Sequence, residues 1–97
     1  MKLKEITLQQ NIILMNEISF LIGIHDLSVN DRINNIIDNI DDDGATVFAE
    51  YCKFAADNYN NSIFDYGLEE YLKRYADDLL DKFIQDKIIM TPDGRNK

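Results

Sequence analysis

The hydrophobic positions along the chain recur at helical spacing and predict four helices. The first stripe follows a capping pattern at Thr7 and Gln10, and Gly23 is a suitable end for the helix. Its members are Leu8, Ile12, Met15, Ile18 and Ile22. A second stripe follows another capping pattern at Ser28 and Asp31. Its members are Ile33, Ile36, Ile37 and Ile40.

The run from Asp41 to Gly44 predicts a break between the second and third helices. Three carboxylates oppose the negative end of a helix dipole, and glycine suits the left-handed conformation at a helix end. Asp43 is then the expected N-cap of a third helix, because a carboxylate can accept hydrogen bonds from the free backbone N–H groups. This helix should end in the turn-forming residues 58–61.

A third capping pattern, Ser62 with Asp65, opens the last helical region, and Gly67 interrupts it. From Leu68 a helix of about 20 residues, roughly 30 Å long, is expected. Its apolar stripe is Leu72, Tyr75, Leu79 and Phe83. The predicted fold class is therefore all-α, a small single-domain bundle of about four helices with a long last one. Residues 1–90 form the expected domain and residues 91–97 a flexible C-terminal tail.

Composition places the protein in the cytoplasm and gives it a modest core. The chain has 97 residues, 45% of them hydrophobic, and one cysteine, Cys52. A single cysteine cannot form an internal disulfide, which fits a reducing compartment. The most apolar window, Ile12–Ile24, contains Glu17 and is too short to span a membrane. A bias towards Ile, Asn, Asp and Lys indicates an AT-rich coding sequence, as in low-GC bacteria and their phages.

Charge is the informative feature, because it is unevenly placed. The net charge is −8, and residues 26–65 carry −7 of it, with only Arg32 and Lys53 as cations. Five carboxylates without a base among them form what we call the acidic ridge: Asp38, Asp41, Asp42, Asp43 and Glu50. Such acidity argues against direct contact with nucleic acid or with an anionic membrane, since both require Lys and Arg.

The acidic run resembles the calcium-binding loop of EF-hand proteins. Asn39, Asp41 and Asp43 fall at positions 1, 3 and 5, Gly44 at position 6 and Glu50 at position 12. The resemblance is incomplete, because position 1 is Asn, position 8 is Thr46 and the chain contains no second hand. A helix–loop–helix connection with an acidic N-cap is the expected structure, and no metal or other cofactor is predicted.

Motifs for catalysis are absent from the sequence. His25 is the only histidine, and no spacing places a nucleophile beside it. Cys52 lies on an expected helix face among apolar residues, where a cysteine behaves as a small hydrophobic residue. The chain has no glycine-rich phosphate loop, no CxxC and no HExxH. The sequence therefore predicts a protein that is not an enzyme.

The expected function is binding to a protein with a basic surface through the acidic ridge. Carboxylates spread over two helix ends can imitate part of the phosphate pattern of DNA, as small phage-encoded inhibitors of host nucleic-acid-binding proteins do. The alternative is a structural or assembly factor that forms a homodimer through the long last helix. Its expected interface is Tyr71, Tyr75, Leu79 and Phe83. A third reading, that the acidity serves only solubility, stays open.

Overall fold

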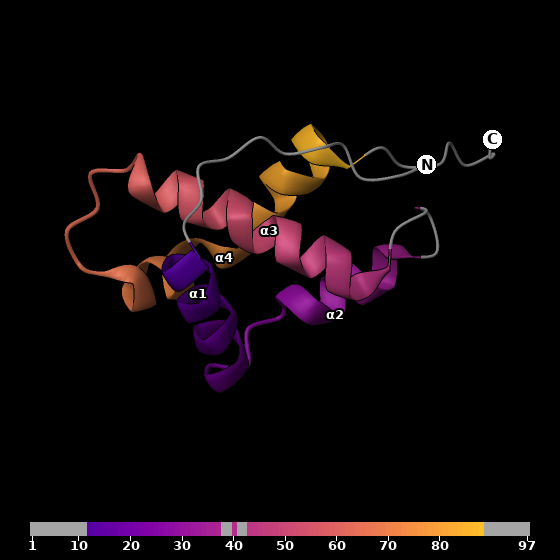
Figure 1. The fold of residues 1–97 in the computed structure, drawn as a ribbon, viewed down its shortest axis with the longest axis horizontal. Coiled ribbons are helices and arrows are strands. Elements are labelled where there is room, and N and C mark those ends of the chain that lie inside the picture. The colour runs from indigo at the N-terminus through magenta and orange to yellow at the C-terminus, as the bar shows by residue number, and fades with distance from the viewer. Residues whose placement is uncertain (1–11, 38–39, 41–42, 89–97) are drawn as a thin grey trace.

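The computed structural model describes residues 12–37, 40 and 43–88, and these residues form four helices. They are α1 (Ile12–Ile24), α2 (Val29–Ile36), α3 (Gly44–Asn60) and α4 (Leu68–Lys87). α3 runs along the length of the molecule with α4 crossing behind it, and α1 and α2 lie together on one side of α3 (Figure 1). The prediction of a small all-α bundle is confirmed, as is the 20-residue length of the last helix. The predicted tail, residues 91–97, lies outside the described residues.

The core is centred where α3 crosses α4. The Phe83 ring is fully buried and meets the Tyr51 ring edge-on at 5.9 Å between centroids, with the Phe54 ring at 5.6 Å. Tyr51 is fully buried as well, and its hydroxyl donates a 2.9 Å hydrogen bond to the backbone oxygen of Ala76. This bond removes the penalty of a buried unpaired hydroxyl, and it fixes α3 against α4. Ile18 and Ile33 bring α1 and α2 into the same cluster.

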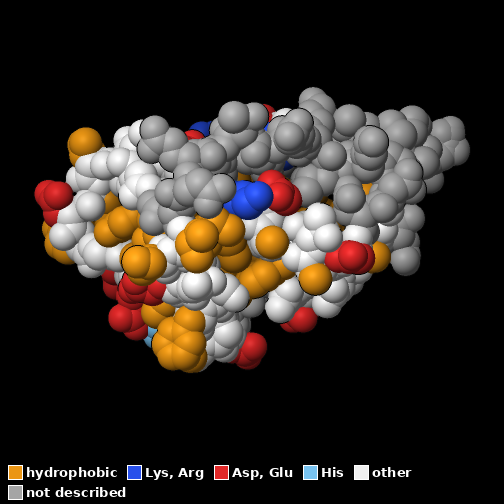
Figure 2. Space-filling model, viewed as in Figure 1, with side chains coloured by type: hydrophobic (Ala, Val, Ile, Leu, Met, Phe, Trp, Pro, Cys, Tyr) orange, Lys and Arg blue, Asp and Glu red, His pale blue; other side chains and the backbone are white. Residues whose placement is uncertain are grey.

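α1 and α2 form a corner with an angle of 96° between their axes. Among the described residues no single helix is long and apolar enough to span a membrane, and α1 and α2 reach that length only as this bent pair. Leu21 and Ile22 on α1 are buried, whereas Phe20 and Ile24 are exposed. Figure 2 shows hydrophobic side chains at the surface over α1. α1 is therefore apolar on its outer side as well as on its core side.

Of the four predicted helix caps, the one at Thr7 and Gln10 lies outside the described residues, and the other three have different outcomes. The Asp43 carboxylate accepts a 2.7 Å hydrogen bond from the Thr46 backbone N–H, which confirms it as the N-cap of α3. Ser28 does precede α2, but its hydroxyl donates to Asp77 on α4 rather than capping its own helix. The prediction at Ser62 is wrong, because residues 62–67 are not helical and the Ser62 hydroxyl donates back to the Tyr59 carbonyl.

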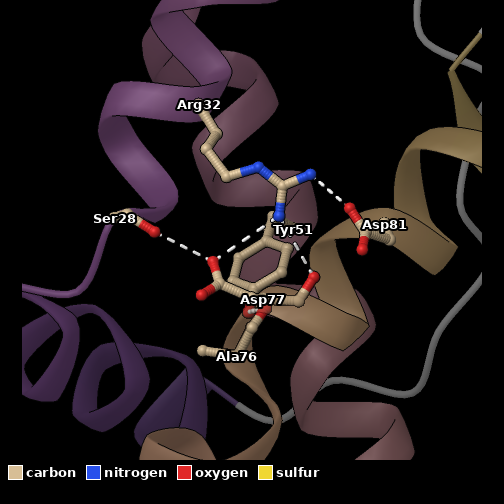
Figure 3. A network of polar contacts seen from close by, with 6 residues as sticks. All are labelled: Ser28, Arg32, Tyr51, Ala76, Asp77 and Asp81. Atoms are coloured by element: carbon tan, nitrogen blue, oxygen red, sulfur yellow. Dashed lines mark hydrogen bonds and ion pairs between the residues drawn. The ribbon is translucent and has the colours of Figure 1, made fainter.

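A polar cluster joins α2 to the middle of α4 (Figure 3). The Arg32 guanidinium contacts the carboxylates of Asp77 and Asp81, which are one helical turn apart, and it also donates to the Asp77 backbone oxygen at 3.3 Å. The Ser28 hydroxyl donates to the same Asp77 carboxylate at 2.9 Å. The hydrogen bond to Asp81 is the main reason why the pKa of Arg32 is raised. Arg32, one of the two cations in the acidic stretch of residues 26–65, is thus paired with carboxylates of α4.

Candidate functional site

Aromatic side chains gather where the chain passes from α3 to α4. The Phe64 ring, from the connection, packs on the rings of Tyr71 and Tyr75 on α4 at 5.5 Å and 5.8 Å. Tyr66 meets Phe64 at 5.4 Å on the outside of the cluster. Gly67 allows this approach, since its φ of +90° is a conformation that side-chain-bearing residues rarely adopt. The connection therefore brings Phe64 back onto α4, while Ile63 and Tyr66 stay exposed.

An open groove of about 720 Å³ begins at this cluster and runs along α4. One face of α4 provides its base, at the spacing i, i+4, i+7, i+11 and i+14. These residues are Tyr71, Tyr75, Asp78, Lys82 and Gln85. The connection closes one end with Phe64, Asp65 and Tyr66, and Asp81 lies at the edge. We call this site the aromatic groove. It combines exposed aromatic surface with carboxylates, which is the composition of a binding site.

The groove is acidic, and its carboxylates differ in their availability. Asp81 is already paired with Arg32. Asp65 and Asp78 are exposed, and within the described part of the chain no hydrogen bond or ion pair engages either carboxylate. Lys82 is the basic residue of the lining. Lys82 is a neighbour of Asp78 on this helix face, four residues away, although no ion pair joins the two. A positively charged group entering the groove would therefore meet two carboxylates that are not held in an ion pair with a described residue.

Two residues of the acidic ridge can be placed in the structure, and both have structural partners. Asp43 is exposed and caps α3, and its hydrogen bond from Thr46 lowers the pKa of its carboxyl group. Glu50 is largely buried, and its Oε2 accepts a 3.0 Å hydrogen bond from the Lys53 ammonium. Asp38, Asp41 and Asp42 lie outside the described residues. In the loop that resembles a calcium site, positions 39, 41 and 42 also lie outside the described residues, whereas Glu50, its position 12, is paired with Lys53.

The residues expected to form a homodimer interface lie mainly in the interior of the single chain. Phe83 is fully buried, and Leu79 and Tyr71 are 6% and 7% exposed. Burial also raises the pKa of Tyr71. Only Tyr75, at 38% exposure, offers surface to a second molecule. The apolar stripe of α4 is thus covered by α3 and by the connection within the same chain.

The two residues considered for catalysis occupy ordinary structural positions. His25 Nε2 lies 2.6 Å from Glu69 Oε2, which ties the end of α1 to the first turn of α4. Cys52 is buried, and desolvation raises the pKa of its thiol to about 12, so it is protonated near neutral pH. In the described part of the chain, no three His, Cys, Asp or Glu side chains converge as a metal site would require.

The aromatic groove could have been noticed only in part from the sequence. The sequence places Tyr71 and Tyr75 as neighbours on one helix face, and the prediction assigns them to a dimer interface. The same face continues through Asp78, Lys82 and Gln85, and that spacing is visible in the sequence. Phe64 could not be assigned, because its position depends on how the non-helical connection folds back.

Asp43 gives a testable dependence of stability on pH. Because its pKa is lowered in the folded state, its contribution is complete above the ordinary value of 3.8 and is lost as the pH falls through the folded pKa. Asparagine caps helices about as well but carries no charge. We expect Asp43→Asn to unfold at a lower temperature than the wild type near neutral pH, and the gap to shrink at a pH well below 3.8, as the Asp43 carboxylate becomes protonated. Thermal melts followed by circular dichroism measure this, and an equal gap at both pH values would contradict it.

Comparisons of the chain with protein-family models, with curated proteins and with solved structures found no match.

Proposed function

We propose that this chain is a non-enzymatic binding protein of the cytoplasm that engages the basic surface of a partner protein. The partner class that fits best is a nucleic-acid-binding protein, and the role is that of a small phage-encoded inhibitor. The supporting observation is which carboxylates pair with the cations of residues 26–65. Residues 26–65 carry −7, and they contain two cations. Arg32 pairs with Asp77 and Asp81 on α4, and Lys53 pairs with Glu50, so the proposal rests on the other ridge carboxylates, Asp38, Asp41, Asp42 and Asp43.

Neither cation is then available to the other carboxylates of residues 26–65, and we expect these carboxylates to form a negative surface. Among the described residues, no cation contacts the exposed carboxylates of Asp26 and Asp31. Asp38, Asp41 and Asp42 add three charges nearby in the sequence. A surface of this kind accelerates association with a basic partner and makes binding sensitive to salt. A nucleic-acid-binding protein offers the matching surface, because it carries Lys and Arg in an array that fits phosphates.

A charge-reversal experiment tests this proposal. The wild-type chain and a variant with Asp38, Asp41 and Asp42 changed to Lys serve as baits in a nuclease-treated bacterial lysate. Asp43 is left unchanged, because it caps α3. We expect the wild type to retain basic nucleic-acid-binding proteins at low salt and to release them at about 0.5 M salt, where charges are strongly screened. The variant should lose them at both salt concentrations, as measured by quantitative mass spectrometry.

A control variant separates a local surface from overall acidity. Glu17, Asp86 and Asp93 changed to Lys alter the net charge by the same amount and lie outside residues 26–65, and Glu17 and Asp86 are exposed. We expect this control to retain the same proteins as the wild type. Equal loss from both variants would mean that acidity acts only through net charge, and equal retention by both would contradict a charge-driven interaction.

A further inference from the structure

We infer that the aromatic groove binds an arginine side chain of the partner, with its guanidinium against the Tyr75 ring and hydrogen-bonded to the Asp78 carboxylate. This inference rests on the proposed function, because it requires a basic partner. It assigns the recognition of that partner to a defined pocket, in addition to the diffuse charge of the acidic ridge.

The molecule already contains one arginine bound in this way. The Arg74 guanidinium lies over the rings of Tyr66 and Phe64, at 5.5 Å and 5.7 Å from their centroids. Its Nε donates a 2.8 Å hydrogen bond to Glu70, one turn earlier on α4. This hydrogen bond raises the pKa of Arg74 and lowers that of Glu70. Two aromatic rings of the connection together with one carboxylate of α4 thus hold a guanidinium on this protein.

Tyr75 and Asp78 offer one ring and one carboxylate inside the groove, but without an arginine. They are three residues apart and therefore lie on the same face of α4. Tyr75 is 38% exposed, so its ring is accessible to a ligand. Asp78 has no hydrogen bond or ion pair to any other described residue, whereas Asp81 beside it is taken by Arg32. Asp65 approaches from the connection as a second unpaired carboxylate of the lining.

Arginine fits this site better than lysine or an apolar side chain does. A guanidinium is planar and weakly hydrated, so it can stack on a tyrosine ring and still donate to a carboxylate at its edge. A lysine ammonium is a compact, strongly hydrated charge that stacks less well. An apolar side chain would cover the Asp78 and Asp65 carboxylates without giving them a hydrogen bond, which is unfavourable.

The length of the groove indicates how the arginine is presented. From Tyr71 to Gln85 its base rises by about 21 Å, at 1.5 Å per residue. An extended segment of about six residues would cover this distance, at about 3.3 Å per residue. Lys82 lies further along the base than Asp78, so a segment with an acidic residue beyond its arginine would complement both ends. The occupant is therefore an exposed, extended arginine-containing segment of the partner.

Short synthetic peptides test the inference without the partner in hand. The probes are the capped peptides Gly-Gly-Arg-Gly-Gly, its lysine analogue and its citrulline analogue, which keeps the shape of arginine but has no charge. Binding is followed by ¹H–¹⁵N correlation spectra of the full-length protein. We expect the arginine peptide to shift the resonances of Tyr75, Asp78 and their neighbours, and to bind about two- to five-fold more tightly than the lysine peptide. The citrulline peptide should bind more weakly than either.

Matched variants connect the result to the groove. Asp78→Asn and Tyr75→Leu should each weaken the arginine peptide by about two- to five-fold. Asp86→Asn, on the same helix but outside the groove, should leave binding unchanged. Equal binding of the arginine and citrulline peptides, or an equal effect of Asp78→Asn and Asp86→Asn, would overturn the inference. A norleucine analogue of the same peptide serves as an apolar probe. Tighter binding of this analogue than of the arginine peptide would overturn the inference as well, because it would make the groove an apolar site.

The two proposals can fail separately. The variant with Asp38, Asp41 and Asp42 changed to Lys should still bind the arginine peptide, because it leaves Tyr75, Asp78 and Asp65 unchanged. If peptide binding is lost in Asp78→Asn while the lysate partners are retained, the groove binds arginine but does not carry the partner interaction, and this inference about the partner is wrong. If the charge-reversed bait keeps its partners while Asp78→Asn loses them, the proposal that the acidic ridge binds the partner is wrong, and the inference that the aromatic groove binds it is supported.

Discussion

A Phe83→Ala variant is expected to lose about 3–5 kcal/mol of unfolding free energy. Phe83 is fully buried and packs against the rings of Tyr51 and Phe54, so its removal leaves a cavity between α3 and α4. A domain of this size has a total stability of about 5–15 kcal/mol. The variant should therefore unfold at a much lower urea concentration than the wild type, or be partly unfolded in buffer. Urea titration followed by circular dichroism measures the difference.

Phe20→Ala is the matched control, because it removes the same ring from a surface position. Phe20 is 65% exposed on α1, and substitutions at such sites change stability by about 0.5 kcal/mol or less. We expect its unfolding midpoint to stay close to that of the wild type. A change as small in Phe83→Ala as in Phe20→Ala would contradict the assignment of Phe83 to the core.

Gly67→Ala is expected to destabilise the protein by about 1–3 kcal/mol through the backbone alone. Gly67 has φ +90° and ψ 166°, a region that only glycine adopts readily. A Cβ added there would meet no atom within 4 Å, so the cost comes from the conformation and not from a clash. The thermal unfolding midpoint and the urea midpoint should both fall, with the helical signal at low temperature preserved.

Gly23→Ala is expected to have the opposite sign. Gly23 lies inside α1, and a Cβ there also meets nothing within 4 Å. The two glycines therefore have equally open surroundings and differ in backbone conformation. Alanine in a helix is more stable than glycine by about 0.5–1 kcal/mol, so the midpoint should rise. If both substitutions changed stability in the same direction, the left-handed conformation at Gly67 would be in doubt.

The sequence predicted the helices well wherever side-chain pattern and local capping agree. Asp43 was correctly expected to cap α3, because that interaction joins residues only three apart in the chain. At Ser28 and Ser62 the same local rule failed. The Ser28 hydroxyl donates to Asp77, 49 residues away on α4. The Ser62 hydroxyl donates to the Tyr59 carbonyl, in a connection held by the packing of Phe64. A hydroxyl takes the best available partner, and the local pattern does not include distant ones.

Charge pairing shows the same limit. Glu70 and Arg74 have the i, i+4 spacing of a pair on one helix face, and they are paired at 2.8 Å. Glu69 and Lys73 have the same spacing, but Glu69 lies beside His25 instead. Arg32, counted as part of the acidic segment, neutralises Asp77 and Asp81 on α4. Pairs within one helix follow from spacing, while pairs between helices require their relative placement.

By itself the sequence determined the fold class, the order and approximate length of the helices, and the concentration of negative charge in residues 26–65. These properties depend on the 3.6-residue period and on composition, which are local. Only the tertiary structure decided which side of α4 is buried, and that the connection folds back with Phe64 on Tyr71 and Tyr75 to form the aromatic groove. The reason is physical: a helix with apolar residues on more than one side can bury any of them, and the choice depends on how the other helices pack against it.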